Sequence, residues 1–127
     1  MQDPGAIRRS ELARRGESAA EAHLLRRGYR ILARNLRVGR DEIDLLAVDP
    51  DGRTVVVVEV KTRERQDAHP EAAVGAVKQR RLARAALALT DRAPYRGRPF
   101  RFDVIAVSPL PDAALEVLHF EAAFDAP

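Results

Sequence analysis

The sequence predicts a single α/β domain, residues 1–127, in which helices cover a central β-sheet. Four consecutive valines and Val60, within the segment Val55–Lys61, have the β-branched density of a strand that is buried on both faces. Apolar residues recur at helical spacing on either side of this segment, and turn signals separate the strands. With 127 residues, of which 46% are hydrophobic, the chain is long enough to form one core and needs no second domain.

The first helix is expected from about Ser10 to Arg27, after a loose arm at residues 1–9, and it should end at Gly28. Its apolar stripe consists of Ala13, Gly16, Ala20 and Leu24. Glu17 falls within this stripe and is therefore expected to point inward. A carboxylate in that position needs a cation or a metal shared with other carboxylates, and the helix alone favours neither.

Two strands are expected next, Tyr29–Arg37 and Glu42–Val48, and a turn at Asp49–Gly52 joins the second of them to the valine strand as a hairpin. If Asp49 faces Gly52, Asp44 lies opposite Val57 and diagonal to Glu59 on the same face. A slip of two residues would place Asp44 directly opposite Glu59, whereas a slip of one residue would separate the two carboxylates.

The valine strand ends in Glu59 and Lys61, which share one face because side chains alternate along a strand. Charged groups at the end of a buried strand are costly unless they are paired or bind a ligand. A structural ion pair is the simpler interpretation. Lysine usage favours a functional one, since only Lys61 and Lys78 among the 22 basic residues are lysine, and an amine, unlike a guanidinium, has a pKa that its surroundings can move.

The second half of the chain should form a helix from about Pro70 to about Thr90, a strand over Phe100–Val107, and an edge strand with a tail over residues 109–127. The apolar stripe of the helix consists of Val74, Val77, Leu82, Ala85 and Leu89. Lys78 also lies on this stripe, so it either reaches the site or packs its stem and extends its amine into solvent. Asp103 is a further candidate accessory residue.

Charge and composition limit the function classes. All 22 basic residues precede position 102 and four of the 19 acidic residues follow Asp103, so residues 1–103 carry a net charge of +7. A basic protein of this kind attracts nucleic acid. A general bias of the sequence toward arginine would explain the positive charge equally well. The chain has no cysteine, no apolar leader and no apolar run of membrane-spanning length, so a cytoplasmic protein without a membrane partner is expected.

Five short motifs occur in this order along the chain: Arg15-Gly16-Glu17, Arg34-Asn35, Glu42-Ile43-Asp44-Leu45-Leu46, Glu59-Val60-Lys61-Thr62-Arg63 and Arg101-Phe102-Asp103-Val104. Together they resemble the bacterial UPF0102 (YraN-like) family of predicted endonucleases, in the PD-(D/E)xK nuclease superfamily and related to archaeal Holliday junction resolvases. The resemblance implies a restriction-endonuclease-like αβββαβ core with a mixed central sheet. Asp41 departs from the pattern, because family members often carry glycine there, and it could disturb the turn.

The resemblance also implies a site. Asp44, Glu59 and the Val60 carbonyl would hold Mg²⁺ or Mn²⁺, Lys61 would orient or activate the attacking water, and Glu17 would complete the site. Arginines near the strand ends would bind DNA phosphates without reading sequence. These arginines are Arg34, Arg37, Arg40, Arg63 and Arg65.

Three functions therefore compete. The first is a metal-dependent DNA endonuclease acting on branched or structured DNA, with a homodimer considered because cutting two strands needs two sites. The second is a non-catalytic nucleic-acid-binding module with a nuclease-like fold. The third is a protein-interaction domain in which Glu59 and Lys61 form a structural pair.

Overall fold

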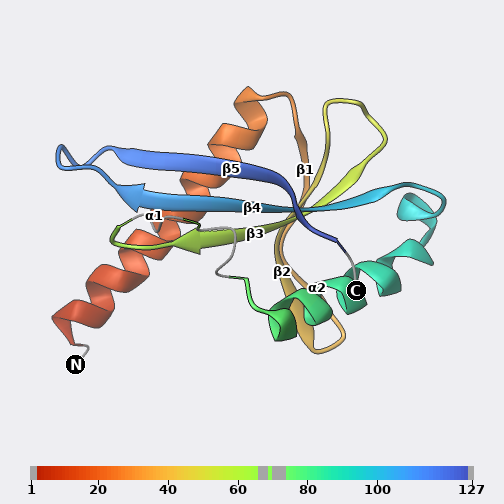
Figure 1. Cartoon of the computed structure of the whole chain (residues 1–127), viewed down its shortest axis with the longest axis horizontal. Coiled ribbons are helices and arrows are strands. Elements are labelled where there is room, and N and C mark those ends of the chain that lie inside the picture. The colour runs from red at the N-terminus through yellow and green to blue at the C-terminus, as the bar shows by residue number, and fades with distance from the viewer. Residues whose placement is uncertain (1–2, 66–68, 70–73, 126–127) are drawn as a thin grey trace.

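A five-stranded sheet carries one long helix on each face (Figure 1). The computed structural model describes residues 3–65, 69 and 74–125. The elements in chain order are α1 (Pro4–Arg26), β1 (Arg30–Val38), β2 (Asp41–Val48), β3 (Val55–Thr62), α2 (Ala76–Thr90), η2 (Ala93–Tyr95), β4 (Phe100–Pro109) and β5 (Leu115–Phe124). The predicted α/β class and the αβββαβ order are confirmed, and β5 is the edge strand expected within residues 109–127.

The sheet is mixed and its strands follow the order β1-β2-β3-β4-β5. β1, β2 and β3 are antiparallel neighbours, β3 and β4 are parallel, and β5 returns antiparallel to β4. A parallel pair needs a crossover connection, and α2 provides it. In Figure 1 the β1–β2 hairpin runs across the direction of β3, β4 and β5, so the twist of the sheet turns the hairpin away from the other strands.

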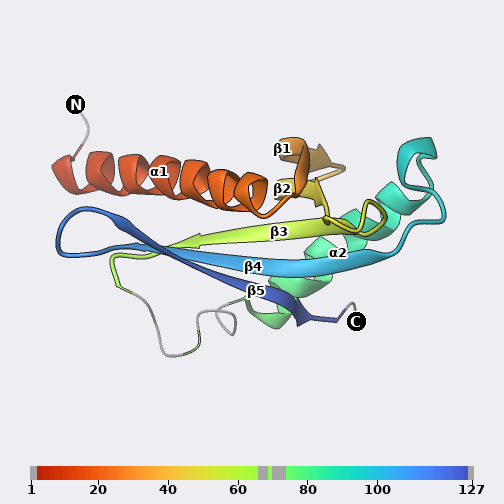
Figure 2. The ribbon, with the colours of Figure 1, turned by 90° about the horizontal axis from the view of Figure 1, so that it is seen from above.

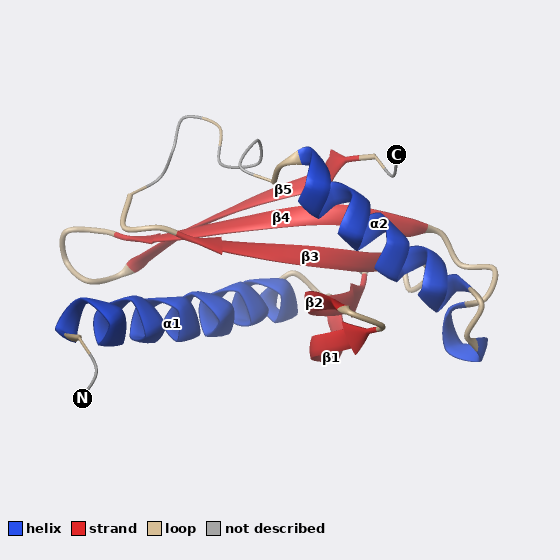
Figure 3. Cartoon of the chain, turned by 90° about the horizontal axis from the view of Figure 1, so that it is seen from below, coloured by secondary structure: helices blue, strands red, loops and turns tan. Residues whose placement is uncertain are grey.

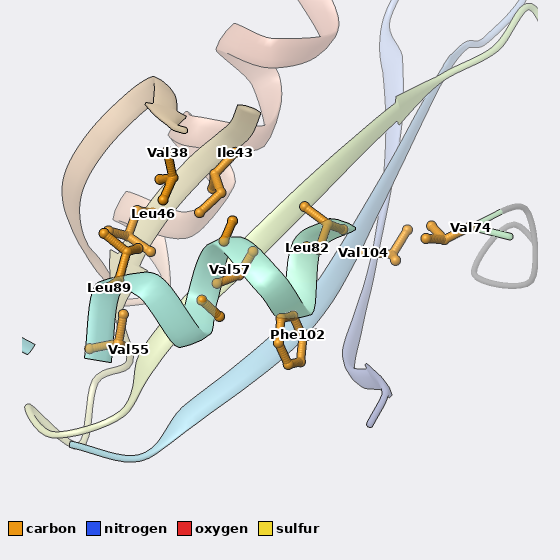
Figure 4. Close-up of a cluster of buried hydrophobic side chains, with 12 residues drawn as sticks. Val38, Ile43, Leu46, Val55, Val57, Val74, Leu82, Leu89, Phe102 and Val104 are labelled. Atoms are coloured by element: carbon orange, nitrogen blue, oxygen red, sulfur yellow. The ribbon is translucent and has the colours of Figure 1, made fainter. Parts of the chain in front are cut away.

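Each face of the sheet has its own hydrophobic core. α1 lies on one face and α2 on the other (Figures 2 and 3). α1 buries Ala20 and Leu24 in a cluster with Val56 and Val58. α2 packs Leu82 and Leu89 against the opposite cluster, which includes Val55 and Val57 (Figure 4). The prediction that the valine strand is covered on both faces is therefore confirmed.

The first helix begins earlier than predicted. Residues 4–9 are helical rather than a loose arm, because the Asp3 side chain caps the helix by accepting a hydrogen bond from the Ala6 amide at 3.1 Å. Pro4 fits the first turn, where its missing N–H costs nothing. Asp3-Pro4 is thus a start signal that lies upstream of the predicted boundary.

The second helix begins at Ala76, and its predicted start at Pro70 lies outside the described residues. Val77 was expected on the apolar stripe, but its side chain is 54% exposed. The buried positions Leu82, Ala85 and Leu89 follow spacings of three and four, whereas Val77 precedes Leu82 by five and so faces elsewhere. The last strand, expected over Leu115–Phe120, extends four residues further, to Phe124.

In the described part of the chain, neither α1 nor α2 is both long and apolar enough to span a bilayer.

Candidate active site

The β2–β3 hairpin has a wider loop than the sequence predicts. Val48 pairs with Val55, and the Asp49 amide donates to the Thr54 carbonyl at 2.9 Å, so Asp49 does not face Gly52. Asp51 explains the width, because its carboxylate accepts hydrogen bonds from the amides of Arg53 and Thr54 at 2.7 and 2.9 Å. The register is therefore the two-residue slip, and the paired residues end at Leu45 and Val58, one position before Asp44 and Glu59.

Asp44 lies where β2 separates from β3. The β2–β3 pairing ends at Leu45 and Val58, whereas β3 continues to Thr62. The Asp44 carboxylate takes over the role of a backbone acceptor, since its Oδ2 accepts a hydrogen bond from the Val60 amide at 2.9 Å. A side chain on one strand thus reaches the backbone of the next strand, immediately beside Glu59.

Glu59 is a buried carboxylate with only 4% of its surface exposed. Both lysines of the chain lie against the same oxygen, with Lys78 Nζ at 3.5 Å and Lys61 Nζ at 3.9 Å from Glu59 Oε1. The other oxygen, Oε2, is also buried and has no hydrogen-bond partner in the described part of the protein. A buried carboxylate oxygen without a donor is costly, so this atom calls for a ligand.

Asp44 and Glu59 lie close enough for the charge of one to act on the other. Burial, reinforced by the charge of Asp44, raises the pKa of Glu59 to about 7. Burial also raises the pKa of Asp44, against the hydrogen bond from Val60 and the charge of Lys78. Two coupled carboxylates with raised pKa values and two amines beside them are typical of a functional site.

Glu17 lies at the margin of this cluster. Its side chain is exposed, so the prediction that it points inward is wrong, but it lines a small pocket of about 130 Å³ together with Asp44. Burial and the charges of Asp44 and Glu42 raise the pKa of Glu17. Glu42 is thus a nearby carboxylate that the sequence analysis did not assign to the site.

A glycine positions this part of α1 against β3. A Cβ atom on Gly16 would lie 2.3 Å from Thr62 Oγ1, so the two elements approach closely only because position 16 has no side chain. Glu17 follows Gly16 directly, and Thr62 follows Lys61 directly. The close contact therefore fixes the distance between Glu17 and the end of β3.

Asp103 does not join Glu59. It pairs in register with Val58, whose side chain packs on the α1 face, whereas Glu59 lies on the α2 face. Arg101 donates two hydrogen bonds to Asp103 at 2.8 and 2.9 Å, and His119 Nε2 lies 2.8 Å from its carboxylate. Asp103 therefore belongs to a separate buried network and is not an accessory residue of the site.

The five predicted phosphate-binding arginines do not form one surface. Arg34 is paired with Glu21 in the small pocket that Glu17 lines. Arg63 donates a hydrogen bond to the Thr62 carbonyl at 3.3 Å. Arg37 and Arg65 are exposed, and of the five arginines only Arg40 lines a depression between the β1–β2 turn and α2.

That depression, of about 530 Å³, lies between the β1–β2 turn and α2. Helical spacing predicts Arg80 and Arg84 on the outer face of the helix, away from its apolar stripe, so the sequence alone does not reveal this depression. Arg84 instead binds Asp41 through two hydrogen bonds of 2.7 and 2.8 Å. Asp41 is thereby neutralised and the turn at Gly39 and Arg40 is intact, so the expected disturbance by Asp41 does not occur.

The donor set suits a hard divalent cation in chemistry but is incomplete in geometry. The two carboxylates and the Val60 carbonyl offer oxygen ligands, which Mg²⁺ prefers, and Glu59 Oε2 lacks a partner. Within residues 3–65, 69 and 74–125, however, no three histidine or carboxylate side chains converge closely enough to hold a metal ion. Mg²⁺ usually keeps several waters and binds proteins through one or two carboxylates, so the residues fit a partly hydrated ion.

Two solved structures show a distant likeness to the chain. A repair endonuclease from Pyrococcus abyssi matches with a TM-score of 0.42 and 19% identity, covering 89% of this chain and 42% of that one. The Pyrococcus furiosus SfsA in complex with Ca²⁺ matches with a TM-score of 0.40 and 17% identity, covering 83% of this chain and 60% of that one. The chain thus spans less than two thirds of either protein, and at this level neither likeness bears on activity.

Sequence relatives are much closer. A UPF0102 protein of Symbiobacterium thermophilum is 48% identical over 112 residues, covering 87% of this chain and 93% of the relative. A UPF0102 protein of Syntrophotalea carbinolica is 46% identical over 119 residues, covering 92% and 94%. The model of the uncharacterised protein family UPF0102 matches residues 16–107, a span that runs from Gly16 at the α1–β3 contact to the end of β4. The chain belongs to the UPF0102 family.

Proposed function

We propose that this protein is a metal-dependent DNA endonuclease whose site is Asp44, Glu59, Lys61 and the Val60 carbonyl. The observation that carries the proposal is the state of Glu59, which is buried, has both lysines on one oxygen and has no partner for the other among the described residues. An ion pair alone explains the first oxygen. An ion pair leaves the second oxygen, Oε2, without a partner in the part of the chain that the structure describes, whereas a bound cation would use both carboxylate oxygens.

In this proposal each residue has a separate task. Asp44 and Glu59 hold the cation, and Lys61 orients the attacking water or stabilises charge on the phosphate. A bound Mg²⁺ would lower the pKa of a coordinated water and offset the charge of the phosphodiester. Water oxygen then bonds to phosphorus, the bond from phosphorus to one sugar oxygen breaks, and a proton reaches the departing oxygen. Glu17, at the rim beside Asp44, lies where it can position that water.

The proposal predicts nicking of DNA that depends on Mg²⁺ or Mn²⁺. Glu59→Gln and Lys61→Met should each lower the rate by at least about 100-fold, because they remove a ligand and a charge that act in the transition state. Supercoiled, linear and branched DNA should be assayed with either metal, and circular dichroism should show an unchanged fold. Glu11→Gln is the matched control, since Glu11 is an exposed carboxylate on α1. Wild-type protein that leaves all three substrates intact with both metals would contradict the proposal.

Metal binding can be tested apart from turnover. A ligand present at ten times its dissociation constant stabilises a protein by about 1.4 kcal/mol, which raises the melting temperature of a domain of this size by roughly 3–6 °C. Mg²⁺ or Mn²⁺ should produce such a shift in the wild type and in Glu11→Gln, but not in Glu59→Gln. Equal shifts in all three proteins would exclude Glu59 as a ligand.

One observation favours a second function, binding without turnover. No third carboxylate or histidine among the described residues completes a metal site with Asp44 and Glu59. A non-catalytic module predicts DNA binding that is unchanged or strengthened in Glu59→Gln, because removing a negative charge reduces repulsion of phosphate. It also predicts no metal-dependent product at any enzyme concentration.

A further inference from the structure

The depression between α2 and the β1–β2 turn has cations on both of its sides. Arg40 extends from the turn, and Arg80 and Arg81 extend from α2. In the described part of the protein none of these three side chains forms a hydrogen bond or an ion pair with a carboxylate. The fourth arginine, Arg84, is already bound to Asp41. The hydrogen bonds from Arg84 lower the pKa of Asp41 most, and the charges of Arg40 and Arg81 lower it further. The guanidinium groups of Arg40, Arg80 and Arg81 are nevertheless not bound to a carboxylate in the described residues.

Helical spacing places four of the lining residues on one face of α2. They are Val77, Arg80, Arg81 and Arg84, which follow one another at intervals of three, one and three residues. Both arginines and Val77 are exposed. Val77 is apolar, yet 54% of its surface is exposed on the same face as the two arginines. This face of α2 is turned away from the core that Leu82 and Leu89 form.

The depression connects directly to the site. Lys78 lines it, and the amine of Lys78 lies 3.5 Å from Glu59 Oε1. Glu42, which raises the pKa of Asp44, lines it as well. A polyanion lying along the arginines would therefore meet Lys78 next and Glu59 immediately behind it.

We infer that this groove, defined by Arg40, Val77, Lys78, Arg80 and Arg81, binds the phosphodiester backbone of DNA and directs it to Glu59. The inference rests on the proposed function and deepens it, since it locates the substrate on the α2 side of the site. No aromatic side chain lines the groove, so bases have no surface on which to stack. The contacts are with phosphates, and binding is independent of sequence.

Salt dependence measures these contacts. The logarithm of the binding constant for duplex DNA falls with the logarithm of salt concentration by about 0.9 for each phosphate that the protein neutralises. The double variant R80Q/R81Q should lower this slope by about 2, which corresponds to roughly 60-fold weaker binding at 0.1 M salt if affinity at 1 M is unchanged. The probe is a short mixed-sequence DNA duplex, titrated by fluorescence anisotropy in EDTA between about 50 and 200 mM salt.

Two controls distinguish binding in the groove from a general effect of the protein's positive charge. R26Q/R92Q removes the same charge from two exposed arginines outside the groove, and it should leave the slope within about 0.5 of the wild-type value. Val77 allows a test of opposite sign: V77K should strengthen binding, and V77E should weaken it. A glutamate in the first turn of a helix is favourable for stability, so weaker binding by V77E cannot be attributed to unfolding.

The titrations in EDTA distinguish the inference from the nuclease proposal, because no hydrolysis is required. A protein that binds DNA through the groove but never cuts it would contradict only the nuclease proposal. Any of three results would overturn the inference that DNA binds in the groove. They are equal salt-dependence slopes for R80Q/R81Q and R26Q/R92Q, equal affinities of V77K and V77E for the duplex, and a wild type that does not bind the duplex at about 50 mM salt.

Discussion

The two carboxylate oxygens of Glu59 differ, because one is ion-paired and the other lacks a hydrogen-bond donor among the described residues. Its Oε1 lies between two amines, and its Oε2 is buried without a donor in the described residues. The sequence predicted the pairing with Lys61, since both residues lie on one face of a strand. The approach of Lys78 was left open, because the position of its amine depends on how α2 packs on the sheet.

The raised pKa of Glu59 gives a prediction about stability. Its pKa is raised from 4.5 to about 7, so the unfolded chain loses this proton at lower pH than the folded protein does. Stability that is fully present below about pH 4.5 is therefore lost as the pH rises toward 7, by about 3 kcal/mol. Glu59→Gln cannot ionise and should lack this part of the pH dependence.

The measurement is urea denaturation in EDTA at intervals between pH 4.5 and 8. Glu59→Gln should gain stability relative to the wild type as the pH rises, whereas Glu11→Gln should follow the wild type throughout. Parallel curves for wild type and Glu59→Gln would show that Glu59 titrates normally in the folded protein.

At the scale of elements, the contact between α1 and β3 depends on Gly16. In an open helix, replacing glycine with alanine stabilises by about 1 kcal/mol. Here the added Cβ would lie 2.3 Å from Thr62 Oγ1 and 3.2 Å from Thr62 Cβ, so the two elements must separate. Gly16→Ala should therefore destabilise the protein by about 1–3 kcal/mol, the opposite sign to that expected in solvent.

A double-mutant cycle identifies the cause. Thr62→Ala removes the two closest atoms, so G16A/T62A should recover part of the loss measured by chemical denaturation. Ser18→Ala, on the exposed side of α1, should change stability by less than about 0.5 kcal/mol. If G16A were stabilising, the close approach of helix and strand would not exist in solution.

Element boundaries show which local signals the sequence carries. Asp3-Pro4 is a standard helix start, but residues 4–9 lack an apolar stripe, and the boundary was therefore placed too late. The hairpin register was predicted with the narrowest loop, whereas the side-chain hydrogen bonds of Asp51 favour a wider one. Both differences come from short polar contacts that periodicity does not detect.

At the scale of the whole molecule, Arg101 joins three strands or their ends. It donates to Asp103 on its own strand β4, to Asp49 after β2 at 2.7 Å, and to the Tyr29 hydroxyl before β1 at 2.7 Å. His119 on β5 lies against the same Asp103 and 3.1 Å from His23 on α1. This network explains the Arg101-Phe102-Asp103 motif as structural rather than catalytic.

Removing Arg101 should therefore affect folding of the entire domain. Asp103 is fully buried, and leaving a buried charge without its partner costs about 3–5 kcal/mol. Arg101→Met should lower the free energy of unfolding by that amount, and R101M/D103N should lose less, because the second change removes the charge. Arg98→Met is the control, since the Arg98 side chain donates to the exposed carbonyls of Gly52 and Arg53 rather than to a buried carboxylate. Equal losses for R98M and R101M would contradict this account.

The order of helices and strands could be predicted from the sequence, because period, turn residues and β-branched density are local properties. The network around Arg101 could not, since its members come from α1, β2, β4 and β5 and meet only after the elements have packed. The groove could not be predicted from the sequence for the same reason. Arg80 and Arg81 acquire their partner Arg40 only when the β1–β2 turn lies beside α2.

The two lysines have a practical consequence. They are the only ε-amines in the chain, and both lie within 4 Å of Glu59 Oε1. The lysine side chains that an amine-reactive reagent can modify therefore all lie in this pocket. Reductive methylation with an isotope label would place two spectroscopic reporters in the pocket, and both would respond when an ion or a phosphate arrives there.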